Sequence, residues 1–288
     1  MRVSDDKMAR TKSHLGQQVP TFFYGTAWKE EKTKQLTHLA LKTGFRAIDT
    51  ANQRRHYDEA AAGEGIAAAM IELGLRREDL FIQTKFTFVD GQDHRLPYDA
   101  TAPVATQVQQ SFDSSLEHLK SPYIDSYMLH GPSSAEGLTK LDWEAWKAME
   151  AIHKSGKAKL LAVSNVNYGQ LEALHRGANV KPAFVQNRCF ASTRWDQRIR
   201  EFCNNNGMMY QGFALLTANA AELRSGALQN PVRRHNRSVA EIVFAFALQS
   251  GMIPMTGSSD PVHMRQDLTC YDFELGAGDL LQIENIGG

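Results

Sequence analysis

Four side chains suited to acid–base chemistry lie in the first half of the chain: Asp49, Tyr57, Lys85 and His130. A carboxylate, a phenol, an ammonium and an imidazole can each donate, accept or stabilise a proton at a reacting centre. Each also has a structural explanation, because such an acid can cap a helix, and a lysine or histidine can be paired within a core. The prediction of catalysis therefore depends on whether the fold brings the four together.

Apolar and amphipathic segments alternate along the whole chain. Short apolar runs predict strands at residues 19–26, 45–51, 80–86, 124–130, 160–165, 184–189, 208–213 and 252–256. Helical spacing follows each run, at residues 30–43, 58–74, 104–119, 143–152, 168–178, 196–206, 238–250 and 260–268.

This strict alternation predicts an α/β fold, a (β/α)8 TIM barrel in a single domain over residues 19–288. A doubly wound dinucleotide-binding sheet is disfavoured, because no Gly-x-Gly-x-x-Gly follows the first strand. Residues 1–18 are polar, and we expect them to be disordered or to form a short hairpin.

The carboxyl ends of barrel strands meet at one rim, where active sites are built. Asp49, Lys85 and His130 stand at three successive strand ends, and Tyr57 follows in the adjoining loop. The polar segment 87–103 is long for a loop in a compact domain, which is typical of lids and binding loops. The sequence therefore predicts an active site at this rim.

The composition disfavours several classes of function. Lys plus Arg and Asp plus Glu both number 32, so no nucleic-acid or membrane-surface partner is expected. We find neither a signal-like apolar segment near the start nor a run of about 18 apolar residues. Three widely spaced cysteines argue against a disulfide framework or a metal site. We expect a cytoplasmic protein that is a monomer or a weak homo-oligomer.

The stretches around these positions resemble the aldo-keto reductase superfamily, across essentially the whole chain. The matching pieces are Gly25-Thr26, residues 45–51 (FRAIDTA), Gln83-Thr-Lys85, residues 124–130 (IDSYMLH), 163–165 (VSN), 185–187 (VQN) and Ile253-Pro254. The resemblance implies an NAD(P)H-dependent oxidoreductase that reduces an aldehyde or ketone to an alcohol. It also implies a catalytic tetrad: Asp49, Tyr57, Lys85 and His130.

The residue types suit that reaction. Hydride addition to a carbonyl develops an alkoxide, which needs a proton donor and an electrostatic partner. By the resemblance, Tyr57 donates the proton and Lys85 lowers the pKa of its phenol from about 10. Asp49 holds the ammonium in place, and His130 orients the carbonyl.

The resemblance also implies binding residues. Those for the cofactor are Gly25, Thr26, Ser164, Asn165, Gln186, Phe213, Leu215, Thr256, Gly257, Ser258, Ser259, His263, Arg265 and Asp267. Those for the substrate are Trp28, His56 and Phe86. NADPH is the expected cofactor, with NADH as the alternative, because Met255 and His263 stand where the family often has a lysine and an arginine for the 2′-phosphate.

Two departures from the family pattern affect the site. The family's tyrosine position, five residues after the aspartate, holds Arg54 here, and the chain is two residues longer before Glu59. When the family pattern is shifted by the two inserted residues, His56 and Tyr57 are the two candidates for the proton donor. We favour Tyr57 because the chemistry needs a phenol. The short segment after residue 275 predicts an open pocket, walled by Trp28, residues 87–103 and the Trp195 region, for a broad or bulky carbonyl substrate.

Two other functions are compatible with these residues. Lys85 at a strand end could form a Schiff base with a carbonyl, as in a lyase or aldolase. The displaced tyrosine would also suit a nicotinamide-binding regulatory subunit with little turnover.

Overall fold

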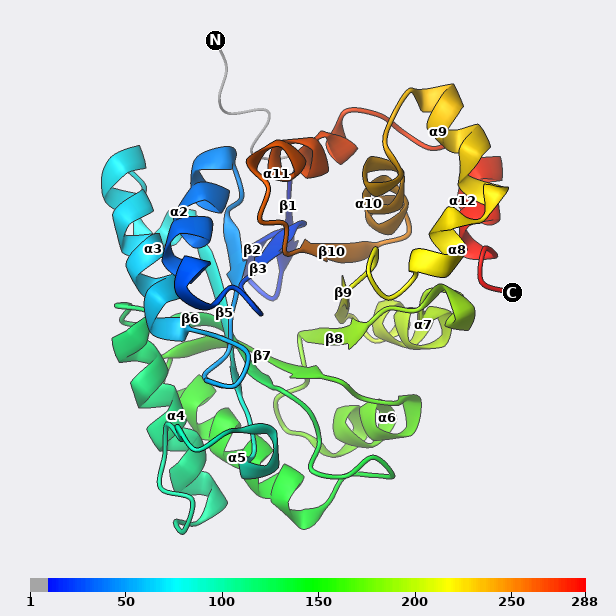
Figure 1. The fold of residues 1–288 in the computed structure, drawn as a ribbon. Coiled ribbons are helices and arrows are strands. Elements are labelled where there is room, and N and C mark those ends of the chain that lie inside the picture. The colour runs from blue at the N-terminus through cyan, green and yellow to red at the C-terminus, as the bar shows by residue number, and fades with distance from the viewer. Residues whose placement is uncertain (1–9) are drawn as a thin grey trace.

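The computed structural model describes residues 10–288, and these form a closed barrel of eight parallel strands (Figure 1). The neighbouring strands follow one another in the chain, and the last pairs with the first to close the ring. The strands are β3 (Phe23–Gly25), β4 (Ala47–Asp49), β5 (Phe81–Phe86), β6 (Ile124–Leu129), β7 (Ala158–Ser164), β8 (Phe184–Arg188), β9 (Met209–Phe213) and β10 (Met252–Thr256). The predicted single-domain (β/α)8 barrel is confirmed.

Helices surround this barrel (Figure 1). Each predicted helix is present as α2 (Thr33–Thr43), α3 (Glu59–Leu73), α4 (Val104–His118), α5 (Lys140–Lys154), α6 (Tyr168–Gly177), α7 (Gln197–Asn205), α10 (Val239–Gln249) and α11 (Pro261–Leu268). Their ends follow local chemistry: Ser238 caps α10 in a capping box with Glu241, and the left-handed Gly74 ends α3. No helix within residues 10–288 is both long and apolar enough to cross a membrane.

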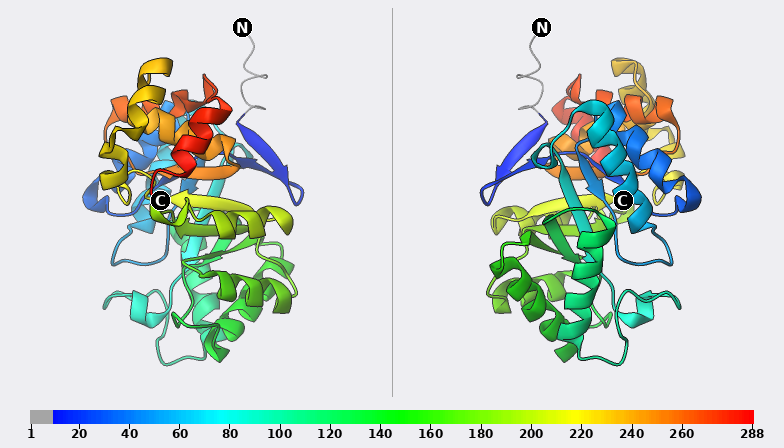
Figure 2. Two further views of the ribbon diagram at one scale, coloured as in Figure 1. Left: turned by 90° about the vertical axis from the view of Figure 1, so that its right-hand side faces the viewer. Right: turned by 90° about the vertical axis from the view of Figure 1, so that its left-hand side faces the viewer.

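A β-hairpin precedes the barrel. It consists of β1 (Thr11–His14) and β2 (Gln17–Pro20), joined through Leu15 and Gly16. Val19 packs with Phe23, Phe81 and other residues at the amino ends of the barrel strands. Figure 2 places the hairpin and the 87–103 loop at opposite ends of the barrel. The single strand predicted for residues 19–26 is therefore wrong: residues 19–20 end the hairpin, and the barrel strand begins at Phe23.

Within residues 10–288, three further α-helices were not predicted: α8 (Ala220–Arg224), α9 (Gln229–His235) and α12 (Ala277–Glu284). The indole nitrogen of Trp195 donates to the carbonyl of Ile283 in α12, at 2.7 Å, and the ring is fully buried. Trp195 therefore packs in the core and does not wall the pocket, which corrects that expectation.

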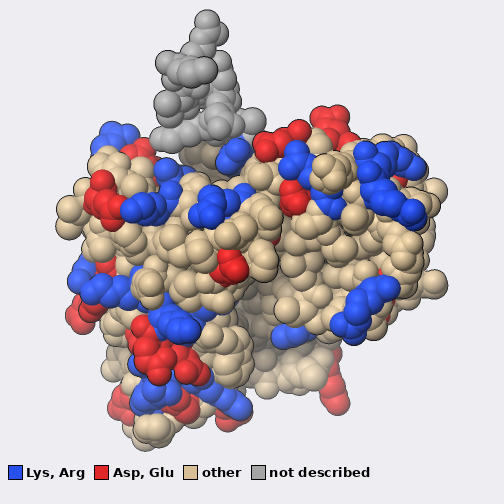
Figure 3. Space-filling model, turned by 45° about the horizontal axis from the view of Figure 1, so that its top comes forward, with Lys and Arg blue, Asp and Glu red and all other residues tan. Residues whose placement is uncertain are grey.

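Charged groups are distributed evenly on the face shown in Figure 3, where basic and acidic side chains are interspersed among larger uncharged areas. Two basic residues at the end of α9 lie beside one buried carboxylate. Arg234 and His235 both contact Asp279, at 2.7 and 3.0 Å. These contacts join α9 to α12.

Candidate active site

The centre of the rim holds a buried ion pair. Lys85 Nζ lies 2.6 Å from Asp49 Oδ2, and also donates to the carbonyl of Thr50 at 2.8 Å. The two residues extend from neighbouring strands β5 and β4, and the Lys85 side chain has no solvent exposure. Burial lowers the pKa of Lys85, and the adjacent carboxylate of Asp49 opposes that shift. The structure thus brings these two predicted residues into direct contact.

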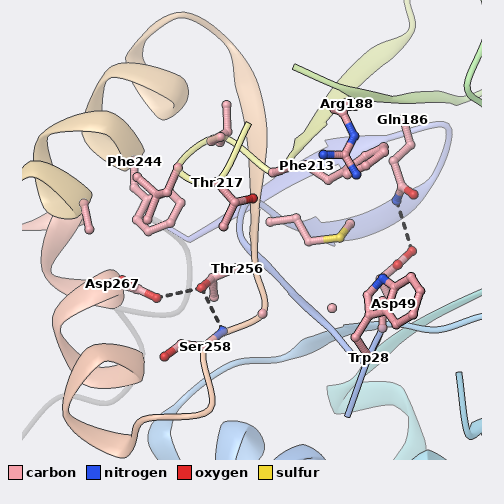
Figure 4. A pocket seen from close by; sticks show the side chains of 18 of the residues that line it. Trp28, Asp49, Gln186, Arg188, Phe213, Thr217, Phe244, Thr256, Ser258 and Asp267 are labelled. Atoms are coloured by element: carbon pink, nitrogen blue, oxygen red, sulfur yellow. Dashed lines mark hydrogen bonds between the residues drawn. The ribbon is translucent and has the colours of Figure 1, made fainter. Parts of the chain in front are cut away.

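Two glutamine amides complete the coordination of Asp49. Its Oδ1 accepts hydrogen bonds from Gln83 Nε2 at 2.7 Å and from Gln186 Nε2 at 3.0 Å. Both amides also donate to Gln211 Oε1 on β9. Strands on opposite sides of the barrel therefore hold one carboxylate, as Figure 4 shows for Gln186 and Asp49. Such a connected network orients the carboxylate toward Lys85.

The loop between β4 and α3 places Tyr57 beside this pair. The Tyr57 ring centroid lies 5.3 Å from Lys85 Nζ and 5.9 Å from the His130 ring. Arg54 instead pairs with Asp58, the N-cap residue of α3, at 2.8 Å and is partly exposed. The two-residue insertion thus leaves Tyr57 in the cavity and Arg54 on the surface.

Tyr57 differs from expectation in its acidity. Burial, reinforced by the nearby charge of Asp49, raises the pKa of its phenol well above the usual value. Lys85 was expected to lower that pKa, but its ammonium lies over the ring and bonds to Asp49 and Thr50. Desolvation is therefore the stronger effect, and Tyr57 is a firmly protonated phenol at neutral pH.

His130 is held by a threonine. Thr87 Oγ1 lies 2.7 Å from His130 Nδ1, and the Thr87 carbonyl in turn accepts from the Tyr98 hydroxyl at 2.7 Å. Burial first, and then the charge of Lys85, lower the pKa of His130 to about 3. The imidazole is therefore neutral, with one N–H. A Thr87 hydroxyl that donates to Nδ1 would leave this N–H on Nε2.

His56 lies across the cavity mouth from this group. Its ring stacks on Trp28 with centroids 4.1 Å apart, and the Trp28 backbone N–H donates to the His56 carbonyl at 2.7 Å. Trp28 remains 68% exposed, so one face of the indole is open to a ligand. Trp28 and His56, two of the three predicted substrate contacts, therefore line the same cavity as Tyr57.

A cavity of about 820 Å³ extends from Asp49 to Asp267 along the rim (Figure 4). Most of the predicted site residues line it: Gly25, Trp28, Asp49, His56, Tyr57, His130, Ser164, Asn165, Gln186, Phe213, Leu215, Thr256, Gly257, Ser258, His263 and Asp267. Its volume falls in the range of cofactor and ligand sites.

Five predicted residues do not line this cavity: Thr26, Lys85, Phe86, Ser259 and Arg265. Lys85 contacts the carboxylate of Asp49, which does line the cavity. The Thr26 hydroxyl donates to the Asp49 carbonyl at 3.1 Å. Phe86, predicted to contact substrate, is fully buried and packs on Phe88 and Tyr98. It points away because neighbouring residues on a strand face opposite sides, and Lys85 faces inward.

The cavity also has lining residues that the sequence analysis did not single out. Among them are Arg188, whose guanidinium lies 5.5 Å from the Phe213 ring centroid, and Thr217, Ser238, Phe244 and Gln266. Arg188 is an exposed charged residue at the carboxyl end of β8. Its position at a strand end of the barrel could have been recognised from the sequence. The others lie on loops and helices whose approach to the rim depends on tertiary packing.

The chemistry of these groups fits a nicotinamide dinucleotide. The Phe213 ring offers a stacking surface, and Gln186 Oε1 and Asn165 Oδ1 are free to accept, since their amide nitrogens donate to Asp49, Gln211 and the His130 carbonyl. At the far end, Thr256 donates to Asp267 at 2.8 Å and accepts from the Ser258 N–H at 3.3 Å (Figure 4). No group of three His, Cys, Asp or Glu residues in the described part of the chain is placed to hold a metal.

Comparison with known proteins agrees with this geometry. The model of the aldo/keto reductase family matches residues 21–287. The chain belongs to the aldo/keto reductase family. This aldo/keto reductase is 32% identical to the uncharacterized oxidoreductase YtbE of Bacillus subtilis, covering 96% of this chain and 92% of that protein. It is 29% identical to the glyoxal reductase of the same organism, covering 95% and 91%.

Solved structures share the fold. An aldo/keto reductase from Brucella melitensis superposes with a TM-score of 0.81 at 24% identity, covering 96% of this chain and 98% of that chain. A Bombyx mori aldo-keto reductase in complex with NADP gives 0.79 at 22% identity, covering 94% and 90%. Family and relatives together make this protein an oxidoreductase, an enzyme that interconverts carbonyl compounds and alcohols.

Proposed function

We propose that this enzyme reduces an aldehyde or ketone with NADPH, using Tyr57 as the proton donor. The observation that carries the proposal is the grouping of Tyr57 with His130 and the buried Lys85–Asp49 pair at one end of a cavity of about 820 Å³. When bound, the cofactor supplies the hydride, and the residues of the chain supply geometry, charge and the proton.

Tyr57 delivers a proton to the carbonyl oxygen as charge develops there. Its raised pKa keeps the phenol protonated before reaction, and Lys85 stabilises the phenolate that remains. Asp49 holds the Lys85 ammonium 5.3 Å from the centre of the Tyr57 ring. The fixed positive charge therefore acts mainly after proton transfer begins, which is when it lowers the barrier.

His130 donates a hydrogen bond to the same carbonyl oxygen. Thr87 occupies Nδ1, so the N–H of the neutral ring is at Nε2, available to the substrate. A neutral donor polarises the carbonyl without competing with Tyr57 as an acid.

The cofactor lies along the cavity in this proposal. Phe213 stacks on the nicotinamide, while Gln186 and Asn165 accept from its carboxamide. Thr256, Ser258 and the amino end of α11 face the phosphates. NADPH is preferred because His263 lines the same part of the cavity as Asp267 and can face the 2′-phosphate. NADH is also accepted, because Met255 stands where a lysine would pair with that phosphate.

The test is NADPH oxidation with 4-nitrobenzaldehyde for wild type, Tyr57→Phe and His56→Ala. Loss of at least a hundredfold in kcat for Tyr57→Phe, with His56→Ala nearly unchanged, supports Tyr57 as the acid. The reverse result assigns the proton to His56. Tight NADPH binding without reduction of any aldehyde contradicts the reductase proposal and supports a regulatory subunit.

The geometry opposes a Schiff-base mechanism. Lys85 Nζ does not line the cavity, and it is committed to Asp49 and Thr50. A carbonyl carbon would have to enter the barrel interior to reach it. Borohydride treatment with substrate should therefore leave Lys85 unmodified.

We also propose that the enzyme acts in the cytoplasm as a monomer or weak homo-oligomer. All three cysteines are buried free thiols, which is typical of reducing compartments. Sedimentation of the purified protein tests the oligomeric state.

A further inference from the structure

A second cavity, of about 620 Å³, opens beside His130. Its walls come from the start of the 87–103 loop, from residues 131–133 after β6, and from α4 and α5. His56, His130 and Asn165 line both cavities. The proposed carbonyl site therefore stands at the junction between them.

This arrangement limits where a substrate can extend. If the first cavity holds the dinucleotide, the space left beside Tyr57 and His130 is the mouth and the second cavity. Gly131 directly follows His130 and has no side chain to close the passage. An added Cβ there would meet Asn165 only at ordinary contact distance, 3.5 Å. The second cavity can therefore be entered from the His130 side without passing a side chain at position 131.

The walls of the second cavity indicate what it binds. Val89 and Leu141 are 39% and 46% exposed, although both are apolar and line the same hollow. Phe88 and Val104 extend this apolar lining. Covering such side chains with an apolar ligand is favourable, because it removes apolar surface from water.

Charge adds a second criterion. Among the described residues that line this cavity, Asp90 is the one acidic side chain, and within residues 10–288 its carboxylate makes no ion pair. No lysine or arginine lines this cavity. An anionic group placed here would meet an uncompensated carboxylate at close range, whereas a cationic group would be attracted.

We propose that the second cavity binds the distal part of the substrate, and that it selects carbonyl compounds with an extended apolar arm carrying no negative charge. This inference rests on the proposed reductase function, which fixes the carbonyl at Tyr57 and His130. An aryl or long alkyl arm would lie between Val89 and Leu141, with its end toward Asp90.

Four aldehydes with electronically similar carbonyls test the selection: propanal, 3-phenylpropanal, 3-(4-carboxyphenyl)propanal and 3-[4-(trimethylammoniomethyl)phenyl]propanal. We expect kcat/KM for 3-phenylpropanal to exceed that for propanal by about tenfold or more, because the phenyl ring is buried. The carboxylate compound should be poorer than the phenyl compound, and the cationic one at least as good. Equal values for the anionic and cationic compounds would overturn the charge criterion.

Two variants tie the effect to this cavity. Leu141→Trp should fill it and lower kcat/KM for 3-phenylpropanal by about tenfold, so that the ratio of the 3-phenylpropanal to the propanal value falls to about one. Ile71→Trp is the matched control, because Ile71 is 86% exposed on α3 and lines neither cavity. Asp90→Lys should shift the preference toward the carboxylate compound by about three- to tenfold. An advantage retained in Leu141→Trp would overturn the proposal.

Binding separates this inference from the reductase function. Calorimetry of the NADPH-loaded protein with 3-phenylpropan-1-ol needs no turnover. If no aldehyde is reduced but the alcohol binds, and Leu141→Trp abolishes that binding, the reductase proposal fails and the cavity assignment stands. If the alcohol binds equally to wild type and Leu141→Trp, the cavity assignment fails whatever the activity.

Discussion

The methyl group of Thr87 packs against Gly91, four residues further along the chain, and this contact directs the Thr87 hydroxyl at His130. A Cβ added to Gly91 would lie 2.6 Å from Thr87 Cγ2, too close for any real contact. With the methyl in that space, Oγ1 faces the imidazole at 2.7 Å. Hydrogen bonds from Tyr98 and Gln92 to the Thr87 carbonyl, at 2.7 and 3.4 Å, hold the backbone of the same residue.

Thr87→Val should lower kcat/KM by about tenfold, because valine keeps the shape and loses the hydroxyl that sets the His130 tautomer. Thr87→Ser keeps the hydroxyl and should retain most of the activity. Steady-state kinetics from pH 5 to 8 should show no His130 ionisation in wild type, since its pKa lies at about 3. If Val and Ser variants lose activity equally, Thr87 serves packing only.

Gly91→Ala should also reduce activity, because the added Cβ would displace the Thr87 methyl group. That displacement would turn the Thr87 hydroxyl away from His130. The loss should shrink when Gly91→Ala is combined with Thr87→Ser, because serine has no methyl to collide. A double-mutant cycle on kcat/KM measures this coupling. Additive effects of the two changes would contradict the steric explanation.

The two partners of the buried ion pair should differ in their effect on stability. Asp49→Asn leaves the Lys85 ammonium buried without a counter-charge and should cost roughly 3 kcal/mol in the free energy of unfolding. Lys85→Met should cost less, because Asp49 keeps hydrogen bonds from Gln83 and Gln186. Urea unfolding of the two variants at neutral pH makes the comparison. A larger loss for Lys85→Met would show that the glutamines do not support the carboxylate.

Asp267 should make stability depend on pH. Burial raises its pKa from 3.8 to about 6 in the folded protein, so the folded state holds this proton more tightly than the unfolded chain. The contribution is therefore fully present below about 3.8 and is lost as pH rises through about 6. Asp267→Asn should gain roughly 1 kcal/mol more over wild type at pH 8 than at pH 5. Denaturant curves at both pH values test this, and an equal gain would place the Asp267 pKa near its ordinary value.

The same ionisation should affect the cofactor. Above pH 6 the Asp267 carboxylate adds negative charge beside Thr256, a residue proposed to face the phosphates. The Kd for NADPH should therefore rise more steeply with pH in wild type than in Asp267→Asn. Fluorescence titration of both proteins measures the difference. Parallel pH dependences would mean that this end of the cavity does not contact the phosphates.

The barrel could be predicted from sequence because each strand and helix is indicated by a short, local pattern of residues. Eight apolar runs and their helices are each readable within about ten residues, and a parallel barrel then fixes which ends meet. That is why Asp49, Lys85 and His130 were expected at one rim. The start of the first strand was misplaced because residues 19–20 continue the apolar pattern, although Val19 pairs with Lys12 in the hairpin.

The parts that could not be predicted depend on contacts between distant segments. The sequence placed Trp195 in the pocket wall. In the structure its indole N–H donates to the carbonyl of Ile283 in α12, a contact between segments far apart in the chain. The pKa of Tyr57 depends on how completely neighbouring elements exclude water from its phenol. The spacing of residues in the sequence does not indicate this. Phe86 was different, since the alternation along β5 already placed it opposite Lys85.

The hairpin at the amino end of the barrel has a consequence for the catalytic cycle. Val19 packs with the apolar residues of that end, while Asp49 lines the cavity at the opposite rim. In the proposed mechanism each turnover consumes the phenolic proton of Tyr57, and its replacement enters through the same opening that admits the substrate. Reprotonation of Tyr57 and release of the alcohol would therefore use the same opening. A product that dissociates slowly would also delay the reprotonation of Tyr57.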